Sequence, residues 1–261
     1  MSLVLYQFEL CPFCQKVRAG MELRGIDYAQ VEVNPMNKRE IKHVELDENG
    51  KKKVPIIEME GNIYRESSDI LRWLDDLDGT DVELKRTDDS LSTRIDEIEG
   101  WVDDHFMRVL PTVLYGSWGQ AIKAARLTAQ TSNFSKFDNL KVSIFGSIIM
   151  RIIANRTLKR IGGGLSAEVL FENCLEHIEG LLTQAYLVDD RPSLADAALH
   201  GAFTCVRDFP AFEQAMSRPS IREWYERVER YRAAGRANAI PATTRAKVAN
   251  DRDVDSSRPI A

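Results

Sequence analysis

Several features that define common protein classes are scarce or missing in this 261-residue chain. It has only four cysteines, and just one pair of them is close in sequence, which is typical of a reducing cytoplasm and not of a secreted domain held by disulfides. The formal net charge is −5, and no basic stripe with interleaved aromatic residues occurs, which argues against a nucleic-acid partner. The first residues already resemble a strand and lack a basic start, so we expect no signal peptide.

Long apolar segments are also missing. The run from Val142 to Met150 ends at Arg151 and is too short and too interrupted to cross a bilayer, so we expect no membrane span. Its surplus of large apolar residues, which includes Phe145 and Ile149, is predicted to lie in the core in preference to a membrane or partner surface. Apolar residues still make up 44% of the chain, and the length is comfortable for two domains.

The motif Cys11-Pro12-Phe13-Cys14 carries the strongest chemical signal. It follows the apolar run from Leu3 to Phe8, which predicts a strand, and it begins a segment with helical spacing that ends at Gly25. Pro12 suits the first helical position, so Cys11 would be the N-cap, where unpaired N–H groups and the helix dipole favour a thiolate. Cys14 would lie one turn away. This arrangement predicts thiol–disulfide chemistry.

A zinc site and a pair of inert cysteines are the alternatives for this motif. A structural zinc site needs four ligands and usually a second paired motif. No such pair is formed by the other candidate ligands, which are Cys174, Cys205, His43, His105, His177 and His200. We therefore expect no metal and favour a redox or glutathione site. Pro12 and the preceding strand argue against inert cysteines.

Residues 1–78 predict alternating strands and helices. A second strand, parallel to the first, is expected at 28–33, a short or irregular helix at 38–46, two strands around the turn at Gly61, and a helix at 67–77. This order, with the Cys-x-x-Cys motif and the Val54-Pro55 pair, resembles the glutaredoxin-like N-terminal domain of glutathione transferases. The resemblance implies an α/β thioredoxin-like domain in which Pro55 is cis and lies beside the active cysteine.

The same resemblance implies a glutathione site. Val54 would pair its backbone with the tripeptide, next to Pro55 and Phe13. Ser67 would accept the γ-glutamyl carboxylate at a helix N-terminus, and Glu66 would take its ammonium group. In the alternative interpretation, Ser67 is only an N-cap and Glu66 is a solvated carboxylate.

The second half of the chain predicts helices almost throughout. One is expected from Leu91 until Pro111 breaks it, and Ser193 with Asp196 forms a capping box before another. The segments at 5–18, 193–199 and 221–230 are similar to the prostaglandin E synthase type 2 branch of the glutathione transferase superfamily. An all-α C-terminal domain is therefore implied. One departure is Phe8, which stands where that branch is expected to have a tyrosine near the cysteine.

These patterns divide the chain into a glutathione-binding domain at 1–78, a linker at 79–89, a helical domain at 90–232 and an extended tail at 233–261. We expect a cytoplasmic thiol transferase or disulfide reductase in which Cys11 attacks, and glutathione or Cys14 resolves, a mixed disulfide. The partners would be glutathione and a small hydrophobic or disulfide substrate, with a homodimer as a further expectation. The alternatives are a transferase or prostaglandin-type isomerase acting on a hydrophobic electrophile, or a non-catalytic module that binds glutathione or, less favoured, haem.

Overall fold

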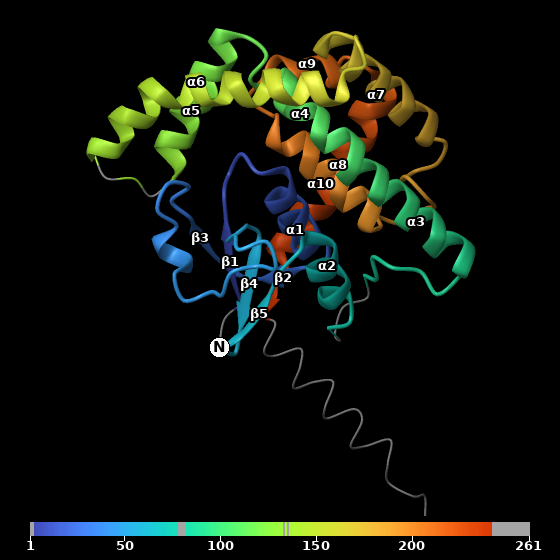
Figure 1. Ribbon diagram of the computed structural model, residues 1–261. Helices are drawn as coiled ribbons and strands as arrows, with labels where there is room; N and C mark the ends of the chain where they lie inside the picture. Colours follow the sequence, from blue (N-terminus) through green and yellow to red (C-terminus); the bar gives the residue numbers. More distant parts are fainter. Residues whose placement is uncertain (1–2, 78–81, 133, 135, 242–261) are drawn as a thin grey trace, which may run out of the picture.

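A small domain built on a β-sheet packs against a larger helical domain in the computed structural model of the chain, which describes residues 3–77, 82–132, 134 and 136–241 (Figure 1). The sheet has the order β3-β1-β4-β5. Its strands are β1 (Val4–Gln7), β3 (Ala29–Glu32), β4 (Ile56–Met59) and β5 (Asn62–Tyr64). β3 is parallel to β1, while β4 is antiparallel to both β1 and β5. The predicted parallel pairing of the first two strands is therefore confirmed.

The two faces of the sheet have different partners because successive side chains of a strand point to opposite sides. Leu3, Leu5 and Ile57 join the main core, to which α1 (Pro12–Leu23), α2 (Ser67–Asp75) and the helical domain also contribute. Tyr6, Phe8 and Ile63 pack on a second, smaller cluster, which consists of Val33, Ile41, Val44 and Ile56. The region predicted as a short or irregular helix at 38–46 contains only one 3₁₀ turn, η1 (Arg39–Ile41).

The helical domain begins with one long rod, in which α3 (Asp89–Trp101), a π-helical turn η2 (Val102–Phe106) and α4 (Met107–Leu114) follow without a break. The expectation that Pro111 ends this helix is wrong, because Pro111 lies inside α4. Proline removes one backbone donor, but Leu110 and Leu114 on either side are buried in the core and hold the helix in place. The remaining helices are α5 (Trp118–Thr131), α6 (Lys136–Ile161), α7 (Ala167–Leu181), α8 (Leu194–Cys205), α9 (Pro210–Met216) and α10 (Pro219–Ala237).

The predicted capping box at Ser193 is confirmed at the start of α8. Asp196 accepts hydrogen bonds from the backbone N–H and the hydroxyl of Ser193, at 2.9 and 2.8 Å. Its other oxygen accepts one from the indole of Trp224, at 2.8 Å. Since Asp196 and Trp224 are both buried, this carboxylate ties α8 to α10 in the middle of the domain.

Helix α6 contradicts the expectation that its apolar surplus is core. It packs on α4 and α5 with the side that carries Ser147 and Ala154, both of which are buried. Its opposite side faces outward, and 43–60% of the surface of each large apolar residue there is exposed: Phe145, Ile148, Ile149, Ile152 and Ile153. The sequence pattern is ambiguous here because, among the described residues, only one side of this helix packs on other helices. No helix among the described residues is long and apolar enough to cross a membrane.

The two domains meet where α8 lies across α1. A Cβ atom on Gly201 would lie 2.4 Å from the backbone nitrogen of Lys16, so only glycine permits this approach of α8 to α1. Lys16 itself is fully buried, and its ammonium group lies 2.8 Å from Glu99 and 2.6 Å from Asp103 of the helical domain. Close backbone packing and a buried ion pair therefore fix the orientation of α1.

The C-terminal helix continues five residues beyond the predicted end of its domain. Arg232 and Arg236 of α10 lie 2.6 and 2.5 Å from the same carboxylate oxygen of Glu22 in α1. After α10, β6 (Ile240–Pro241) pairs in parallel with β2 (Ile26–Asp27). The beginning of the expected tail is thus held against the first domain, whereas 242–261 lie outside the described residues.

Candidate active site

Cys11 occupies the N-cap of α1, as the sequence predicts. Its backbone is extended, with φ −102° and ψ 115°, and Pro12 takes the first helical position. Cys11 is partly exposed, whereas Cys14, one turn further along, is fully buried, and both are free thiols. The side chain of Cys11 makes no capping hydrogen bond of normal geometry. Its sulfur therefore remains available at the end of the helix.

The pKa values of the two thiols in the motif are shifted in opposite directions. A hydrogen bond from the Cys14 thiol lowers the pKa of Cys11, burial opposes this effect, and the backbone N–H groups of Cys14 and Phe13 add to the lowering. Burial raises the pKa of Cys14 well above its usual value, and the hydrogen bond to Cys11 raises it further. Cys11 is consequently the more acidic thiol of the pair, and Cys14 is the less acidic one.

Three groups that sequence reasoning did not assign to the site interact electrostatically with Cys11. Burial raises the pKa of Tyr115, from the end of α4, and electrostatic interactions with Cys205 and Cys11 raise it further, so its hydroxyl stays neutral. Cys205 of α8 donates its thiol to the carbonyl of Leu10 at 3.3 Å. Glu32, at the end of β3, has a pKa raised by burial, and its charge opposes the thiolate.

Tyr115 could not be assigned from the sequence because 100 residues separate it from the motif. Phe8, where a tyrosine was expected, packs on the small cluster beside the sheet. Tyr115 thus brings a hydroxyl from the other domain toward the cysteine.

The Val54-Pro55 peptide bond is cis. Pro55 is buried, and Val54 precedes β4 at the end of the sheet. Among the described residues, no backbone partner is found for the N–H or C=O of Val54. Both groups are therefore free to pair with an extended peptide.

Glu66 adopts an unusual backbone conformation at the start of α2. Its φ of 59° lies in the left-handed region, which is rare for residues other than glycine and is often found at functional sites. Glu66 is the N-cap, and Ser67 is the first helical residue, so Ser67 does not serve as the cap. The buried Ser67 and the free N–H groups of the first turn lie together at the positive end of this helix.

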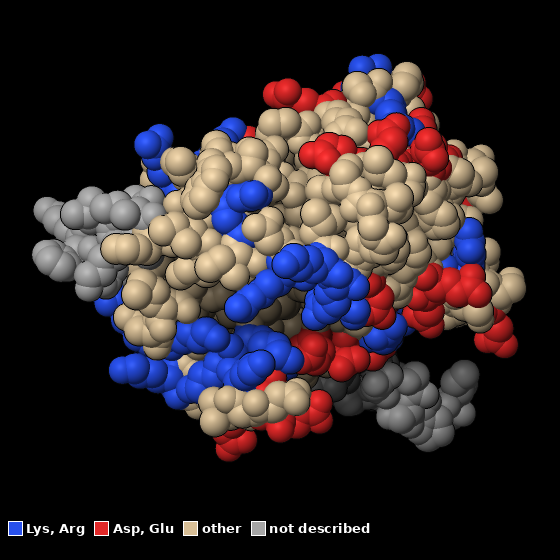
Figure 2. Space-filling view, turned by 45° about the horizontal axis from the view of Figure 1, so that its top comes forward, with Lys and Arg blue, Asp and Glu red and all other residues tan. Residues whose placement is uncertain are grey.

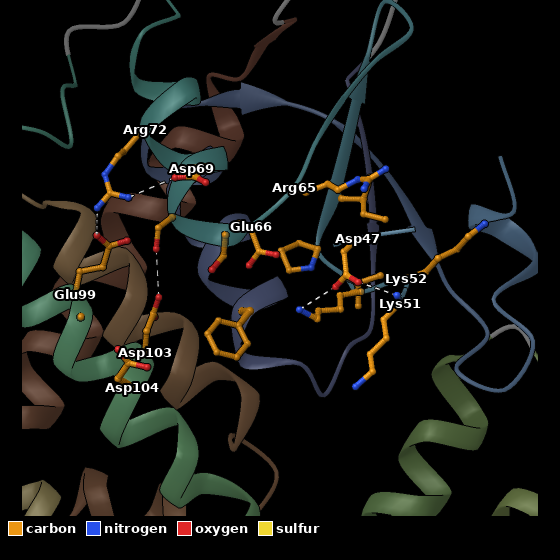
Figure 3. A pocket seen from close by; sticks show the side chains of 18 of the residues that line it. Asp47, Lys51, Lys52, Arg65, Glu66, Asp69, Arg72, Glu99, Asp103 and Asp104 are labelled. Carbon is orange, nitrogen blue, oxygen red and sulfur yellow. Dashed lines mark hydrogen bonds and ion pairs between the residues drawn. The ribbon is translucent and has the colours of Figure 1, made fainter. Parts of the chain in front are cut away.

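A cavity of about 510 Å³ lies between the two domains. Figure 3 shows Glu66 in its middle, with Lys51, Lys52 and Asp47 on one side and Asp103 and Asp104 on the other. In Figure 2, basic side chains gather on both sides of a hollow in the middle of the molecular face. The volume lies within the usual range of sites for small ligands.

Five of the seven predicted site residues line this cavity: Phe13, Val54, Pro55, Glu66 and Ser67. Cys11 and Cys14 are not among the lining residues, although Phe13 lies between them in sequence. The lining also includes Arg65, Asp69 and Arg108, which had no sequence signal of their own. Lys53 is paired with Asp47 at 3.0 Å.

The described residues provide few side chains that could ligate a metal ion or a haem iron. In the described part of the chain, no group of three or more His, Cys, Asp or Glu side chains is placed to hold a metal ion. The described residues that line the cavity include no histidine, cysteine or methionine, so this cavity supplies no common axial ligand for a haem iron.

Two family models match the chain. "Glutathione S-transferase, N-terminal domain" matches residues 5–81, and "Glutathione S-transferase, C-terminal domain" matches residues 167–231. A prostaglandin E synthase 2 from Danio rerio is 23% identical over an alignment of 274 residues, gaps included. The alignment covers 88% of this chain and 71% of that protein. The protein of the same name from Mus musculus is 23% identical over 275 residues, with 88% and 70% covered.

Solved structures share the fold. A glutathione S-transferase-I bound with lactoylglutathione has a TM-score of 0.60 and 16% identity, and the match covers 89% of this chain and 99% of that one. A beta-etherase from Sphingobium sp. strain SYK-6 has a TM-score of 0.55 and 21% identity, with 87% and 99% covered. These matches confirm the predicted fold class, a thioredoxin-like domain followed by an all-α domain.

Proposed function

The chain belongs to the glutathione S-transferase superfamily, and from this premise we propose that it is a glutathione-dependent thiol transferase and disulfide reductase with Cys11 as its nucleophile. The observation that carries this proposal is the position of Cys11 at the N-cap of α1, with Pro12 as the first helical residue and Cys14 one turn further along. A cysteine at a helix N-terminus with a lowered pKa is suited to attack disulfides, since the thiolate is the reactive form.

In the first step, the Cys11 thiolate attacks the glutathione sulfur of a mixed disulfide. The original S–S bond breaks, the substrate leaves as a thiolate that takes a proton from water, and Cys11 becomes disulfide-bonded to glutathione. In the second step, the thiolate of another glutathione attacks the bound glutathione sulfur. Oxidised glutathione leaves, and the Cys11 thiolate is restored.

Cys14 serves this cycle mainly as a hydrogen-bond donor. In a dithiol cycle Cys14 would attack the Cys11 sulfur and release glutathione, but this attack requires a Cys14 thiolate. Because burial raises the pKa of Cys14 well above its usual value, this thiolate is scarce at neutral pH. The electrostatics therefore favour the route in which a second glutathione resolves the adduct.

Glutathione would lie in the cavity between the domains. The cysteinyl unit would pair with the free backbone groups of Val54, which would bring its sulfur toward Cys11. The γ-glutamyl carboxylate would meet Ser67 and the first-turn N–H groups of α2, with the ammonium group at Glu66. In this proposal, the left-handed backbone of Glu66 presents its carboxylate to the ligand.

The test is turnover of a small glutathione mixed disulfide, coupled to a reductase that recycles oxidised glutathione. Cys11→Ser should reduce turnover to background, and Cys14→Ser should remain active. Cys174→Ser is the matched control, because this buried thiol lies on α7 and should leave turnover unchanged. Full activity of Cys11→Ser, or no turnover by a parent protein that binds glutathione, contradicts the proposal.

The second candidate function is isomerisation or glutathione conjugation of a hydrophobic electrophile. The names of the two curated relatives favour it, and so does the neutral hydroxyl of Tyr115 near Cys11, which offers a proton donor to an oxygen of such a substrate. Incubation with a prostaglandin endoperoxide or an aryl chloride discriminates between the candidates. Product formation by a parent protein that lacks disulfide turnover would favour this second function.

A further inference from the structure

Positive charge is concentrated in one continuous part of this acidic chain. Residues 105–167 contain nine of the 35 basic residues but only one of the 40 acidic residues, Asp138. The segment thus carries a net charge of +8, while the whole chain carries −5. Such a contrast points to a partner of negative charge.

This segment lies between the two stretches that the family models match, which end at residue 81 and resume at residue 167. It includes the antiparallel pair α5 and α6, at the upper left of Figure 1. None of the predicted glutathione-site residues belongs to this pair of helices. The proposed glutathione site therefore does not explain the positive charge of these two helices.

The outward side of α6 combines apolar and basic residues. Its middle part exposes Phe145, Ile149 and Ile152, each with 44–60% of its surface accessible. One to two turns further along the same side, Arg156, Lys159 and Arg160 are exposed. With 100° per residue, Phe145, Ile149, Ile152, Arg156 and Lys159 all lie within about 40° of one line along the helix.

The neighbouring helix extends this surface. Trp118, the first residue of α5, has 57% of its surface exposed, and Ile122, one turn later, has 37% exposed. Arg151 of α6 lies over the Trp118 ring, with its guanidinium carbon 5.9 Å from the ring centre. In Figure 2, the left part of the upper half, where these helices lie, shows tan and blue with almost no red.

We propose that the α5–α6 pair, through Trp118, Phe145, Ile149 and Ile152 together with the basic cluster Arg156, Lys159 and Arg160, docks the protein reversibly on a membrane surface that contains anionic lipids. A helix whose apolar residues enter the headgroup region, next to lysines and arginines that meet lipid phosphates, binds by both effects at once. The helix lies in the plane of the surface and does not span the bilayer. This docking is independent of the proposed thiol chemistry.

Charge decides between a membrane and a second copy of the chain. A second copy placed on this surface through a two-fold axis would present the same net positive segment to itself, so like charges would face one another across the contact. Anionic lipid instead supplies the opposite charge along the whole surface. The apolar residues alone would suit either partner, but the basic cluster on the same side suits only one of them.

The experiment measures binding of the full chain to vesicles by co-sedimentation. Phosphatidylcholine vesicles are compared with vesicles that also contain phosphatidylserine, at about 0.05 M and about 0.5 M salt. The variants are Arg156→Glu with Lys159→Glu, and Ile149→Ser with Ile152→Ser. The matched control is Arg222→Glu with Arg230→Glu, which makes the same change in net charge at exposed positions on α10. Circular dichroism confirms that each variant folds.

We expect the parent and the α10 control to bind phosphatidylserine vesicles equally at low salt, and to bind more weakly at high salt. The α6 charge variant should bind at least about tenfold more weakly. The isoleucine variant should bind more weakly at both salt concentrations. Absence of parent binding, or equal binding by every variant, overturns the proposal.

Sedimentation velocity without lipid tests whether a second copy of the chain covers this surface instead of a membrane. We expect the parent and the isoleucine variant to show the same association state. A parent dimer that the isoleucine substitutions convert to a monomer would show that a second copy covers this surface, and it would overturn the membrane proposal.

Discussion

Replacing Cys14 with alanine should make Cys11 a weaker acid. The largest influence that lowers the pKa of Cys11 is the hydrogen bond from the buried Cys14 thiol, and a methyl group cannot donate one. Hydrogen bonds to charged groups contribute about 1.5–3 kcal/mol, and a thiol is a weak donor at the low end of this range. Since one pKa unit corresponds to about 1.4 kcal/mol, we expect the pKa of Cys11 to rise by about one unit.

The assay is the rate of Cys11 alkylation by iodoacetamide as a function of pH, with Cys11→Ser as the background. The midpoint for Cys14→Ala should lie about one unit above that of the parent. Cys14→Ser keeps a donor of similar size, so its midpoint should stay closer to the parent value. An unchanged or lower midpoint for Cys14→Ala would show that the helix N-terminus alone sets the acidity of Cys11.

Three further predictions concern the contact between the domains. Although burial opposes ionisation, the two arginines of α10 hold the pKa of Glu22 below its usual 4.5, so this stabilisation is present above pH 4.5 and should be lost as the pH falls through the lowered value. Urea titrations should accordingly show a smaller loss on acidification for Glu22→Gln than for the parent. Lys16→Met leaves two carboxylates facing each other in the interface and should cost about 3 kcal/mol of unfolding free energy, whereas a cost near zero would show that water reaches them. Gly201→Ala places a Cβ against the α1 backbone and should cost about 1–3 kcal/mol in thermal or urea unfolding, and an unchanged midpoint would mean that α8 moves without penalty.

The local arrangement of the motif could be predicted from the sequence because it depends on neighbouring residues. Pro12 fixes the first helical position, so the N-cap role of Cys11 follows from residues directly beside it. The capping box at Ser193 was predictable for the same reason. The parallel pairing of β1 and β3 instead follows from the helix between them, because a strand–helix–strand unit brings its two strands together in parallel. The cis bond before Pro55 was implied only by the resemblance to glutathione transferases, and it is present in the structure.

Two other predictions were wrong because tertiary packing, and not the local sequence, determines the features they concern. Proline is a helix breaker by local rules, yet Pro111 lies within α4 because the core holds the turns on both sides. The exposed side of α6 was predicted to be core because its apolar residues have the composition of a buried helix. Composition records how apolar a segment is, but not whether another part of the chain covers it.

The sequence by itself determined the main strands of the first domain, the helical character of the second and the N-cap cysteine. These follow from periodicity and from short motifs, whose physical causes act over a few residues. Only the tertiary structure decided that Tyr115 and Cys205 lie near Cys11, that Glu66 takes a left-handed backbone conformation, and that one side of α6 has no partner in the described chain. Acidity, burial and charge at these places depend on groups brought together from distant parts of the chain, and no local pattern encodes such distances.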